Sequence, residues 1–236
     1  MRTIAIINRK GGCGKTTATV NIAAALGESG RRTLLLDLDP QGSASSWLVT
    51  AERTLQVDLA LGAIRALERL PAAWDFVLVD CPPTLGYLAS AALTGCREAL
   101  VPVQPHGLDM WGIEPVMEEM DRVRQQLNTA LVLAGIVVGR ASRTNHAREV
   151  VASLRATYGD DVFQQTIRDS IRVPEAAMAG LAVTEFVSDA AIAADIRAVA
   201  AELVRRDPDD QDLDPVEAER ASGWRGMVGR LVGSRS

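Results

Sequence analysis

The sequence predicts an α/β fold, in which a mostly parallel β-sheet is covered by helices on both faces. Two observations lead to this prediction. Short, continuous apolar runs, such as TIAII at residues 3–7 and FVLV at residues 76–79, are typical of strands that are buried on both sides. Between these runs lie longer stretches whose apolar residues recur at helical spacing, so strands and helices alternate along the chain.

The expected elements can be placed from their hydrophobic spacing and from the turn residues between them. Strands are expected at residues 3–7, 32–39, 74–79, 99–103 and 130–138. Helices are expected at residues 18–26, 55–70, 85–93, 111–127, 147–158 and 192–206.

Three polar features lie at the C-terminal ends of expected strands. They are the loop at residues 9–17, the pair Asp37 and Asp39, and Asp80. Parallel sheets of this kind bind ligands at the carboxyl ends of their strands. We therefore expect these features to converge on one site.

Composition and cysteine usage limit the class of protein. The chain has 236 residues, of which 47% are hydrophobic and 23% charged, which is ordinary for a globular domain. It contains no apolar run near the roughly 20 residues that span a bilayer, and it enters the first expected strand without a signal peptide. Cys13, Cys81 and Cys96 are odd in number and lack metal-ligand spacing. These features predict a cytoplasmic protein.

The C-terminal part differs in charge from the rest. Residues 207–219 carry seven acids and no base, whereas residues 220–236 carry four arginines and no acid. We expect one domain over residues 1–206, an acidic linker at 207–221 and a basic tail at 222–236. The tail is either disordered, which we favour, or a short amphipathic helix that makes a weak membrane or partner contact.

A glycine-rich loop, NRKGGCGKTT at residues 8–17, joins the first expected strand to the first expected helix. In such a turn, backbone N–H groups and the helix N-terminus surround an anion, and glycines let the backbone approach a phosphate. Lys15 is expected to reach the β- and γ-phosphates, and the Thr16 hydroxyl to hold Mg²⁺. The predicted nucleotide-binding residues are Lys10, Gly11, Gly12, Cys13, Gly14, Lys15, Thr16 and Thr17.

The use of lysine sharpens this prediction. The chain has 25 basic residues, and Lys10 and Lys15 are the only lysines. Both stand in the loop, where a compact ammonium suits a crowded phosphate site better than a planar guanidinium. The loop also departs from the common phosphate-loop pattern, because Arg9 stands where the first glycine would be.

The carboxylates at the strand ends predict a metal site. Asp80 ends an apolar strand, where it either binds Mg²⁺ or caps the following turn, and the phosphate loop upstream favours the metal. Asp37 and Asp39 are two apart on the expected strand, so their side chains would share a face. One would assist Mg²⁺ and the other would orient the attacking water. Phosphoryl transfer needs mainly positioning and charge neutralisation, so these groups suffice.

These motifs resemble the ParA/MinD family of P-loop ATPases with a deviant Walker A loop, and most closely its ParA (Soj-like) partition ATPases. The resemblance rests on residues 8–17, on LDLDPQG at 36–42, on DCPPTLG at 80–86, and on VPVQP at 101–105 followed by LDMW at 108–111. Residues 142–206 match more loosely, so the likeness covers roughly residues 1–206.

The resemblance implies a function for the glycine-rich loop and for each of the three aspartates. The cofactors would be ATP and Mg²⁺. Lys10 would reach across a homodimer interface to the partner's nucleotide, so that ATP holds the two subunits together. The implied catalytic residues are Lys10, Lys15 and Asp39, and the implied metal ligands are Thr16, Asp37 and Asp80.

Family resemblance also implies that the ATP-bound dimer binds DNA non-specifically through arginines on one face. The candidates are Arg140, Arg143, Arg168, Arg172, Arg197, Arg205 and Arg206, with Arg168, Arg172, Arg197 and Arg205 leading. Arg172 is the best single candidate because it lies in the better-matching segment. Val138 and Ala141 stand where short ParA proteins tend to have Asn and Asp, so no base-contacting residue is assigned.

Three functional classes follow. The leading hypothesis is a nucleoid-associated ATPase that positions a plasmid, a chromosome locus or a protein assembly, such as a carboxysome or chemosensory cluster. A ParB-like or cargo-specific adaptor would stimulate its hydrolysis. The second class is a MinD-like membrane ATPase for division-site or cell-pole placement. The third is a redox ATPase like the nitrogenase iron protein, which would need paired cysteines in a cluster-binding context.

Overall fold

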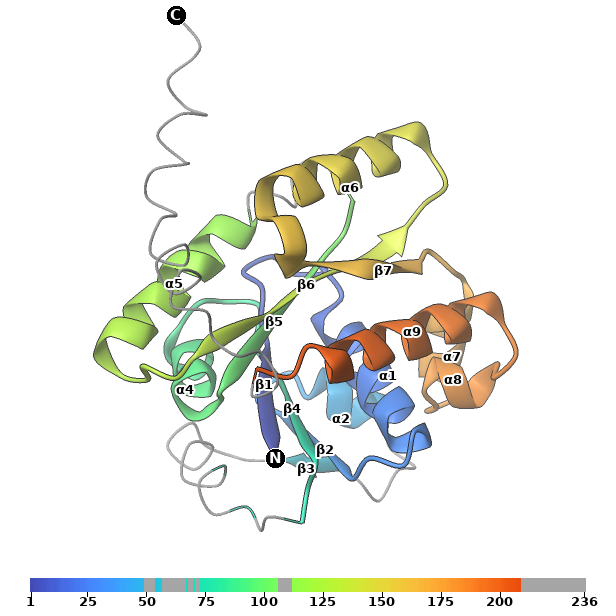
Figure 1. Cartoon of the computed structure of the whole chain (residues 1–236). Helices are drawn as coiled ribbons and strands as arrows, with labels where there is room; N and C mark the ends of the chain where they lie inside the picture. Colours follow the sequence, from blue (N-terminus) through green and yellow to red (C-terminus); the bar gives the residue numbers. More distant parts are fainter. Residues whose placement is uncertain (49–53, 57–66, 68–69, 71–72, 106–111, 209–236) are drawn as a thin grey trace, which may run out of the picture. The chain divides into compact units, whose positions relative to one another are not determined.

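The computed structural model describes residues 1–48, 54–56, 67, 70, 73–105 and 112–208. Within these residues seven strands form one sheet, in the order β3-β2-β4-β1-β5-β6-β7, and all neighbouring strands are parallel (Figure 1). The strands are β1 (Arg2–Ile6), β2 (Thr33–Asp37), β3 (Thr54–Gln56), β4 (Phe76–Asp80), β5 (Glu98–Val103), β6 (Val132–Ala141) and β7 (Val162–Arg168).

Helices cover both faces of this sheet (Figure 1). One face packs against α4 (Tyr87–Gly95), α5 (Ile113–Gln126) and α6 (Asn145–Tyr158). The other packs against α1 (Lys15–Glu28), α7 (Arg172–Met178), α8 (Val183–Phe186) and α9 (Ala191–Arg205). The short helix α2 (Ser43–Trp47) follows β2, and a 3-10 turn, η2 (Gly159–Asp161), precedes β7.

The central strands are buried on both sides, as their apolar runs predict. In β1, Ile4 and Ile6 face the α1 side and Ala5 faces the α4 side, and all three are fully buried. The same alternation holds along β4. Because side chains alternate between faces along a strand, a run with no polar break fills two cores at once. The predicted fold class is confirmed.

Two predicted elements differ from the structure. The helix expected at residues 55–70 is wrong at its start, because Thr54–Gln56 form β3, which pairs with β2. Leu67 is helical, and most of the remaining expected helix lies outside the described residues. The strand expected at 32–39 ends at Asp37. Pro40 follows three residues later, and proline has no N–H to extend the pairing.

The contacts of the chain divide it into a compact unit, Met1–Arg205, and a second unit, Arg206–Ser236. Only residues 206–208 of the second unit are described. The linker at 207–221 and the tail at 222–236 therefore remain predictions. No helix among the described residues is long and apolar enough to cross a membrane.

Candidate nucleotide-binding site

The strand register brings the predicted site residues to one edge of the sheet. In the ladder between β2 and β4, Asp37 lies opposite Asp80, and in the ladder between β1 and β4, Ile6 lies opposite Asp80. The glycine-rich loop begins at Asn8, two residues after β1 ends, and leads into α1. The loop and both aspartates therefore meet at the carboxyl ends of three neighbouring strands, as predicted.

The loop itself has the backbone of an anion cradle. Gly12 and Gly14 have φ angles of +75° and +94°, a region that is costly for any residue with a Cβ. A Cβ built on Gly11, Gly12 or Gly14 would meet no protein atom within 4 Å, so the loop opens onto free space. Helix α1 begins at Lys15, with Thr16 and Thr17 in its first turn, so its N-terminus faces the loop.

Two buried amides hold the loop in place. The Asn8 side chain donates to the Pro102 carbonyl oxygen at 2.7 Å and accepts from the Lys10 N–H at 3.1 Å. The Gln104 side chain donates to the Gly12 carbonyl oxygen at 2.6 Å. These contacts tie the loop to the end of β5. Neither residue was predicted from the sequence to hold the loop, although Asn8 lies two residues after β1 and Gln104 directly follows β5.

The two lysines of the loop have different surroundings. Lys15 is buried, and its Nζ lies 3.3 Å from the Lys10 carbonyl oxygen and 3.9 Å from the Cys13 Sγ. Its ammonium therefore sits inside its own loop, where a bound phosphate would meet it. Lys10 is exposed on the same loop.

Asp80 is the most deeply buried acid of the site. Its side chain is fully buried, and its two oxygens accept hydrogen bonds from the Thr16 hydroxyl at 2.7 Å and the Thr19 hydroxyl at 3.1 Å. Burial raises the pKa of Asp80 to about 6, and the nearby Asp37 carboxylate also raises it. A buried carboxylate with neutral partners is stabilised by a cation.

The donor set fits Mg²⁺. Mg²⁺ is bound through one or two protein oxygens, with waters and nucleotide phosphates completing its shell. Thr16 and Asp80 supply two such oxygens in direct contact. No group of three or more His, Cys, Asp or Glu in the described part of the chain is arranged to hold a metal by itself. The remaining ligands would therefore come from the nucleotide and water.

Asp37 and Asp39 do not share a strand face, so this prediction is wrong. Asp37 is the last residue of β2 and Asp39 lies in the loop beyond it. Asp37 accepts from the Asp39 N–H at 3.1 Å through one oxygen, and from the N–H and hydroxyl of Ser45 through the other. It therefore caps the first turn of α2. Asp39 is half-buried and accepts from the Gln41 N–H at 3.0 Å.

The three cysteines are free and buried. Burial raises the pKa of all three thiols, with nearby charges contributing less. Protonated, enclosed thiols are poor nucleophiles and poor metal ligands. Cys13 thus acts as a small residue that fills the loop. These surroundings argue against the redox class.

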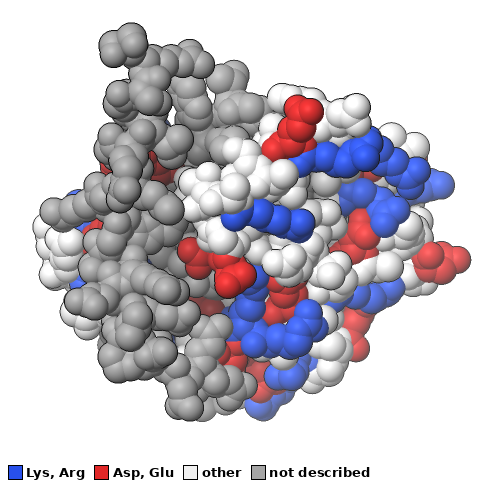
Figure 2. All heavy atoms as spheres, turned by 45° about the horizontal axis from the view of Figure 1, so that its top comes forward, with Lys and Arg blue, Asp and Glu red and all other residues white. Residues whose placement is uncertain are grey.

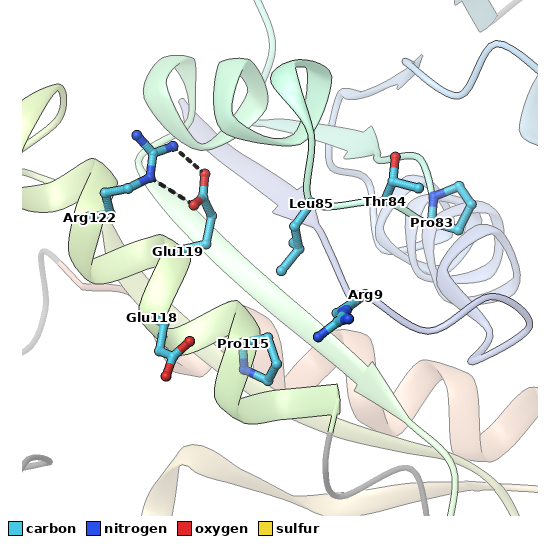
Figure 3. Close-up of a pocket in the computed structure, with 8 residues that line it drawn as sticks. All are labelled: Arg9, Pro83, Thr84, Leu85, Pro115, Glu118, Glu119 and Arg122. Carbon is cyan, nitrogen blue, oxygen red and sulfur yellow. Dashed lines mark hydrogen bonds and ion pairs between the residues drawn. The ribbon is translucent and has the colours of Figure 1, made fainter.

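A pocket of about 610 Å³ adjoins the outer side of the loop (Figure 3). Arg9 enters it from the loop, and the segment after β4 and helix α5 form its other walls. Glu119 and Arg122 pair with each other at 2.6 Å across one turn of α5. The lining residues are Arg9, Pro83, Thr84, Leu85, Pro115, Glu118, Glu119 and Arg122.

The leading arginine candidates do not form one cluster. Arg168, at the end of β7, makes two side-chain hydrogen bonds to Asp195 of α9. Arg205 is the last residue of α9 and lies ten residues after Asp195. At a rise of 1.5 Å per residue, this is about 15 Å along the helix axis. Helix α9 thus separates these two arginines.

Most of the other candidates have carboxylate partners. Arg172 pairs with Glu175 at 2.8 Å, Arg197 with Glu28 at 2.7 Å, and Arg140 with Asp169 at 3.2 Å. Arg143 is exposed, and no described carboxylate pairs with it. A paired arginine must share its charge with its partner before it can bind a phosphate.

The family of CobQ/CobB/MinD/ParA nucleotide binding domains matches residues 4–183 of the chain. The chain is 35% identical over 240 residues to the chromosome-partitioning ATPase Soj of Thermus thermophilus, with 87% of this chain and 96% of that protein covered. It is 31% identical over 248 residues to Soj of Treponema pallidum, with 87% and 98% covered.

Among solved structures, cobyrinic acid a,c-diamide synthase of Mycobacterium smegmatis with bound ADP and magnesium is similar, with a TM-score of 0.70. The two sequences are 27% identical, and the match covers 87% of this chain and 94% of that one. Together with the loop and the Thr16–Asp80 hydrogen bond, these matches assign the chain to a family. It belongs to the CobQ/CobB/MinD/ParA family, whose ParA and MinD members are partition and positioning ATPases, and it is a nucleotide-binding ATPase that uses ATP and Mg²⁺.

Proposed function

We propose that this ATPase forms an ATP-sandwich homodimer that binds DNA non-specifically and hydrolyses ATP slowly, and so segregates or positions a cargo. The cargo is a plasmid, a chromosome locus or a protein assembly. The observation that carries the proposal is the difference between the two lysines. Lys15 lies inside its own loop, whereas Lys10 is exposed beside it, where it is accessible to a second subunit.

Each residue of the site then has a separate task. Lys15 and the backbone of residues 11–17 bind the β- and γ-phosphates. Thr16 and Asp80 hold Mg²⁺, which neutralises charge on the phosphates when it is bound. Asp39 orients the attacking water. Only one of its oxygens has a hydrogen-bond partner among the described residues, so the other is open to water.

Slow hydrolysis sets the lifetime of the dimer, because ATP holds the two subunits together until it is hydrolysed. A ParB-like or cargo-specific adaptor would shorten the ATP-bound state by stimulating hydrolysis. DNA binding by the dimer would place the protein on the nucleoid, through arginines that include Arg168, Arg172, Arg197 and Arg205. In the monomer these arginines are spread over β7, α7 and α9, and a dimer presents each of them twice.

Dimerisation is tested by light scattering after size exclusion, with Mg²⁺ and a non-hydrolysable ATP analogue. We expect the wild type to be monomeric without nucleotide and dimeric with it. Lys15→Ala should lose nucleotide binding and the dimer together. Lys10→Ala should keep nucleotide binding and remain monomeric, and the matched variant Arg9→Ala should still dimerise. If Lys15→Ala dimerises with the analogue as the wild type does, the proposal is wrong.

The MinD-like alternative rests on the sequence of residues 222–236, where an apolar stripe lies beside arginines. Co-sedimentation with liposomes and with DNA, each with ATP, separates the two functions. We expect DNA binding by the full chain and by a chain ending at residue 206. Liposome binding that disappears with the tail, without DNA binding by either chain, would favour the membrane function.

A further inference from the structure

A second cavity, of about 760 Å³, lies between α6 and the edge strand β7. We call it the α6–β7 groove. Both elements lie at the upper right of Figure 1, and Figure 2, in which the top comes forward, shows basic side chains on this side with acidic ones among them. The groove is lined by Ala141, Ser142, Arg143, Ala147, Arg148, Val151, Ala152, Arg155, Gln164, Thr166, Arg168 and Asp195.

The periodicity of the two elements accounts for this lining. On α6, Arg148, Val151 and Ala152, and Arg155 recur every three to four residues, so they share one helix face. On β7, Gln164, Thr166 and Arg168 are two residues apart, so they share one strand face. A basic helix face and a polar strand face therefore line the same channel.

The groove carries a net positive charge. Its lining includes four arginines and one aspartate, which leaves 4 − 1 = +3. The one acid, Asp195, is already paired with Arg168. Arg143, Arg148 and Arg155 form no ion pair with any described carboxylate. Within the described part of the chain, Arg148 donates to the Arg143 carbonyl oxygen and the Asn145 side chain, and neither of these is a carboxylate.

Arg155 adds an unsatisfied donor. Its Nη2 donates to the carbonyl oxygens of Phe163 and Gln164, which fixes the guanidinium against β7. Its Nε is buried and has no hydrogen-bond partner. A buried N–H without an acceptor is costly, whereas the guanidinium as a whole adds its positive charge to the lining of the groove.

We propose that the α6–β7 groove binds phosphates of the DNA backbone, with Arg143 and Arg148 as its principal contacts. This rests on the proposed DNA-binding function and assigns it a site. Arg148 and Arg155 lie about 10 Å apart along the helix axis, which spans about three nucleotides of one strand at 3.4 Å each. The apolar lining is three alanines and one valine, which offers no large side chain for insertion into lipid.

The test measures the affinity of the ATP-bound protein for a fluorescent DNA duplex over a range of salt concentrations. Arg143→Ala/Arg148→Ala removes two exposed arginines that make no ion pair. We expect its affinity near 0.1 M salt to fall at least about 10-fold, and its log–log salt slope to decrease by about 2. Arg31→Ala/Arg32→Ala removes two exposed arginines just before β2, far from β7 in the sheet order. Arg32 pairs with Asp75, and this variant should leave both quantities near wild type. Arg143→Lys/Arg148→Lys keeps the charge and should retain most of the affinity.

Each outcome decides one claim. If wild type binds DNA and Arg143→Ala/Arg148→Ala binds equally, the groove is not the contact, while the proposed function stands. If the wild type with ATP does not bind DNA, the proposed function itself fails. If the lysine variant loses as much affinity as the alanine variant while still dimerising, phosphate attraction is not the role of these residues. Loss of binding to anionic vesicles, with DNA binding unchanged, would also overturn the proposal.

Discussion

At the scale of single residues, the loop depends on two buried side chains, one at its start and one just after β5. Asn8 and Gln104 together make three hydrogen bonds to the backbone of the loop and of β5. Both side chains are buried. Their contacts fix where the loop carbonyls and N–H groups point, and so they position the phosphate site without touching the nucleotide.

Asn8→Ala should therefore weaken nucleotide binding as well as stability. It removes the donor to the Pro102 carbonyl oxygen and the side-chain acceptor of the Lys10 N–H, which costs about 1–3 kcal/mol in the free energy of unfolding. Asn128 is a matched control, because its amide donates to the carbonyl oxygens of Leu93 and Cys96, away from the loop. Denaturation and nucleotide titration are the measurements. Asn128→Ala should lose stability with unchanged affinity, and equal affinity losses in both variants would contradict this account.

The loop glycines offer a second test. Gly14→Ala forces a Cβ into a left-handed conformation, at about 1–2 kcal/mol of unfolding free energy. Gly11 has no such φ angle, so Gly11→Ala should keep stability while its methyl group hinders the approach of a phosphate. Thermal unfolding without nucleotide and titration with ATP separate the two effects. Equal stability losses in both variants would show that the backbone strain is not the cause.

How far the sequence predicts these residues depends on distance along the chain. The loop and Asp80 are predictable because a strand, a turn and a helix carry their pattern within a few residues. The hydrogen bonds from Asn8 to Pro102 and from Gln104 to Gly12 join residues 94 and 92 positions apart, so no local pattern encodes them.

At the scale of elements, α2 links the nucleotide site to a distant segment. Asp37 caps its first turn, and the Trp47 indole donates to the Leu181 carbonyl oxygen at 2.8 Å, just before α8. Asp37 thus has both oxygens engaged before any metal binds. Asp80, in contrast, contacts the Thr16 hydroxyl directly.

This difference predicts unequal effects on Mg²⁺. Asp80→Ala should raise the Mg²⁺ concentration needed for ATP binding much more than Asp37→Ala does. Asp37→Ala should instead lower the free energy of unfolding by about 0.5–2 kcal/mol, as loss of a helix cap does. Mg²⁺ titrations of nucleotide binding, with urea unfolding of both variants, measure the two effects. Equal shifts in the Mg²⁺ requirement would mean that Asp37 contributes as much to Mg²⁺ binding as Asp80 does.

The elements that the sequence analysis missed lack a periodic apolar signal. Strand β7 is an edge strand that contains Gln164, Gln165 and Thr166, and it has no continuous apolar run. Helices α7 and α8 have seven and four residues, too few for a helical repeat to be recognised. Their positions are set by packing against α9 and α1, which are distant in sequence.

At the scale of the whole molecule, one buried ion pair joins the two ends of the compact unit. The Arg2 guanidinium bonds both oxygens of Glu98 in β5, and it also donates to the Leu203 carbonyl oxygen in α9. Both side chains are almost fully buried. The pair therefore ties β1, β5 and the last helix together at the edge opposite the nucleotide site.

Breaking this pair should destabilise the protein strongly. Glu98→Ala removes the carboxylate that binds the buried Arg2 guanidinium through both oxygens, which costs about 3–5 kcal/mol in unfolding free energy. The double variant Arg2→Met/Glu98→Leu should be much closer to wild type, because neither residue is then charged. Chemical denaturation of both variants measures this. A double variant as unstable as Glu98→Ala would show that lost packing, and not the buried charge of Arg2, is responsible.

The central claim is that ATP controls DNA occupancy, and the affinity of the wild-type chain for duplex DNA in each nucleotide state tests it most directly. Affinity should be measured at constant salt with no nucleotide, with ADP and Mg²⁺, and with a non-hydrolysable ATP analogue and Mg²⁺. The account predicts tight, steeply salt-dependent binding with the analogue and weak binding in the other two states. Equal affinity in all three states, or no binding with the analogue when the dimer has formed, would contradict it.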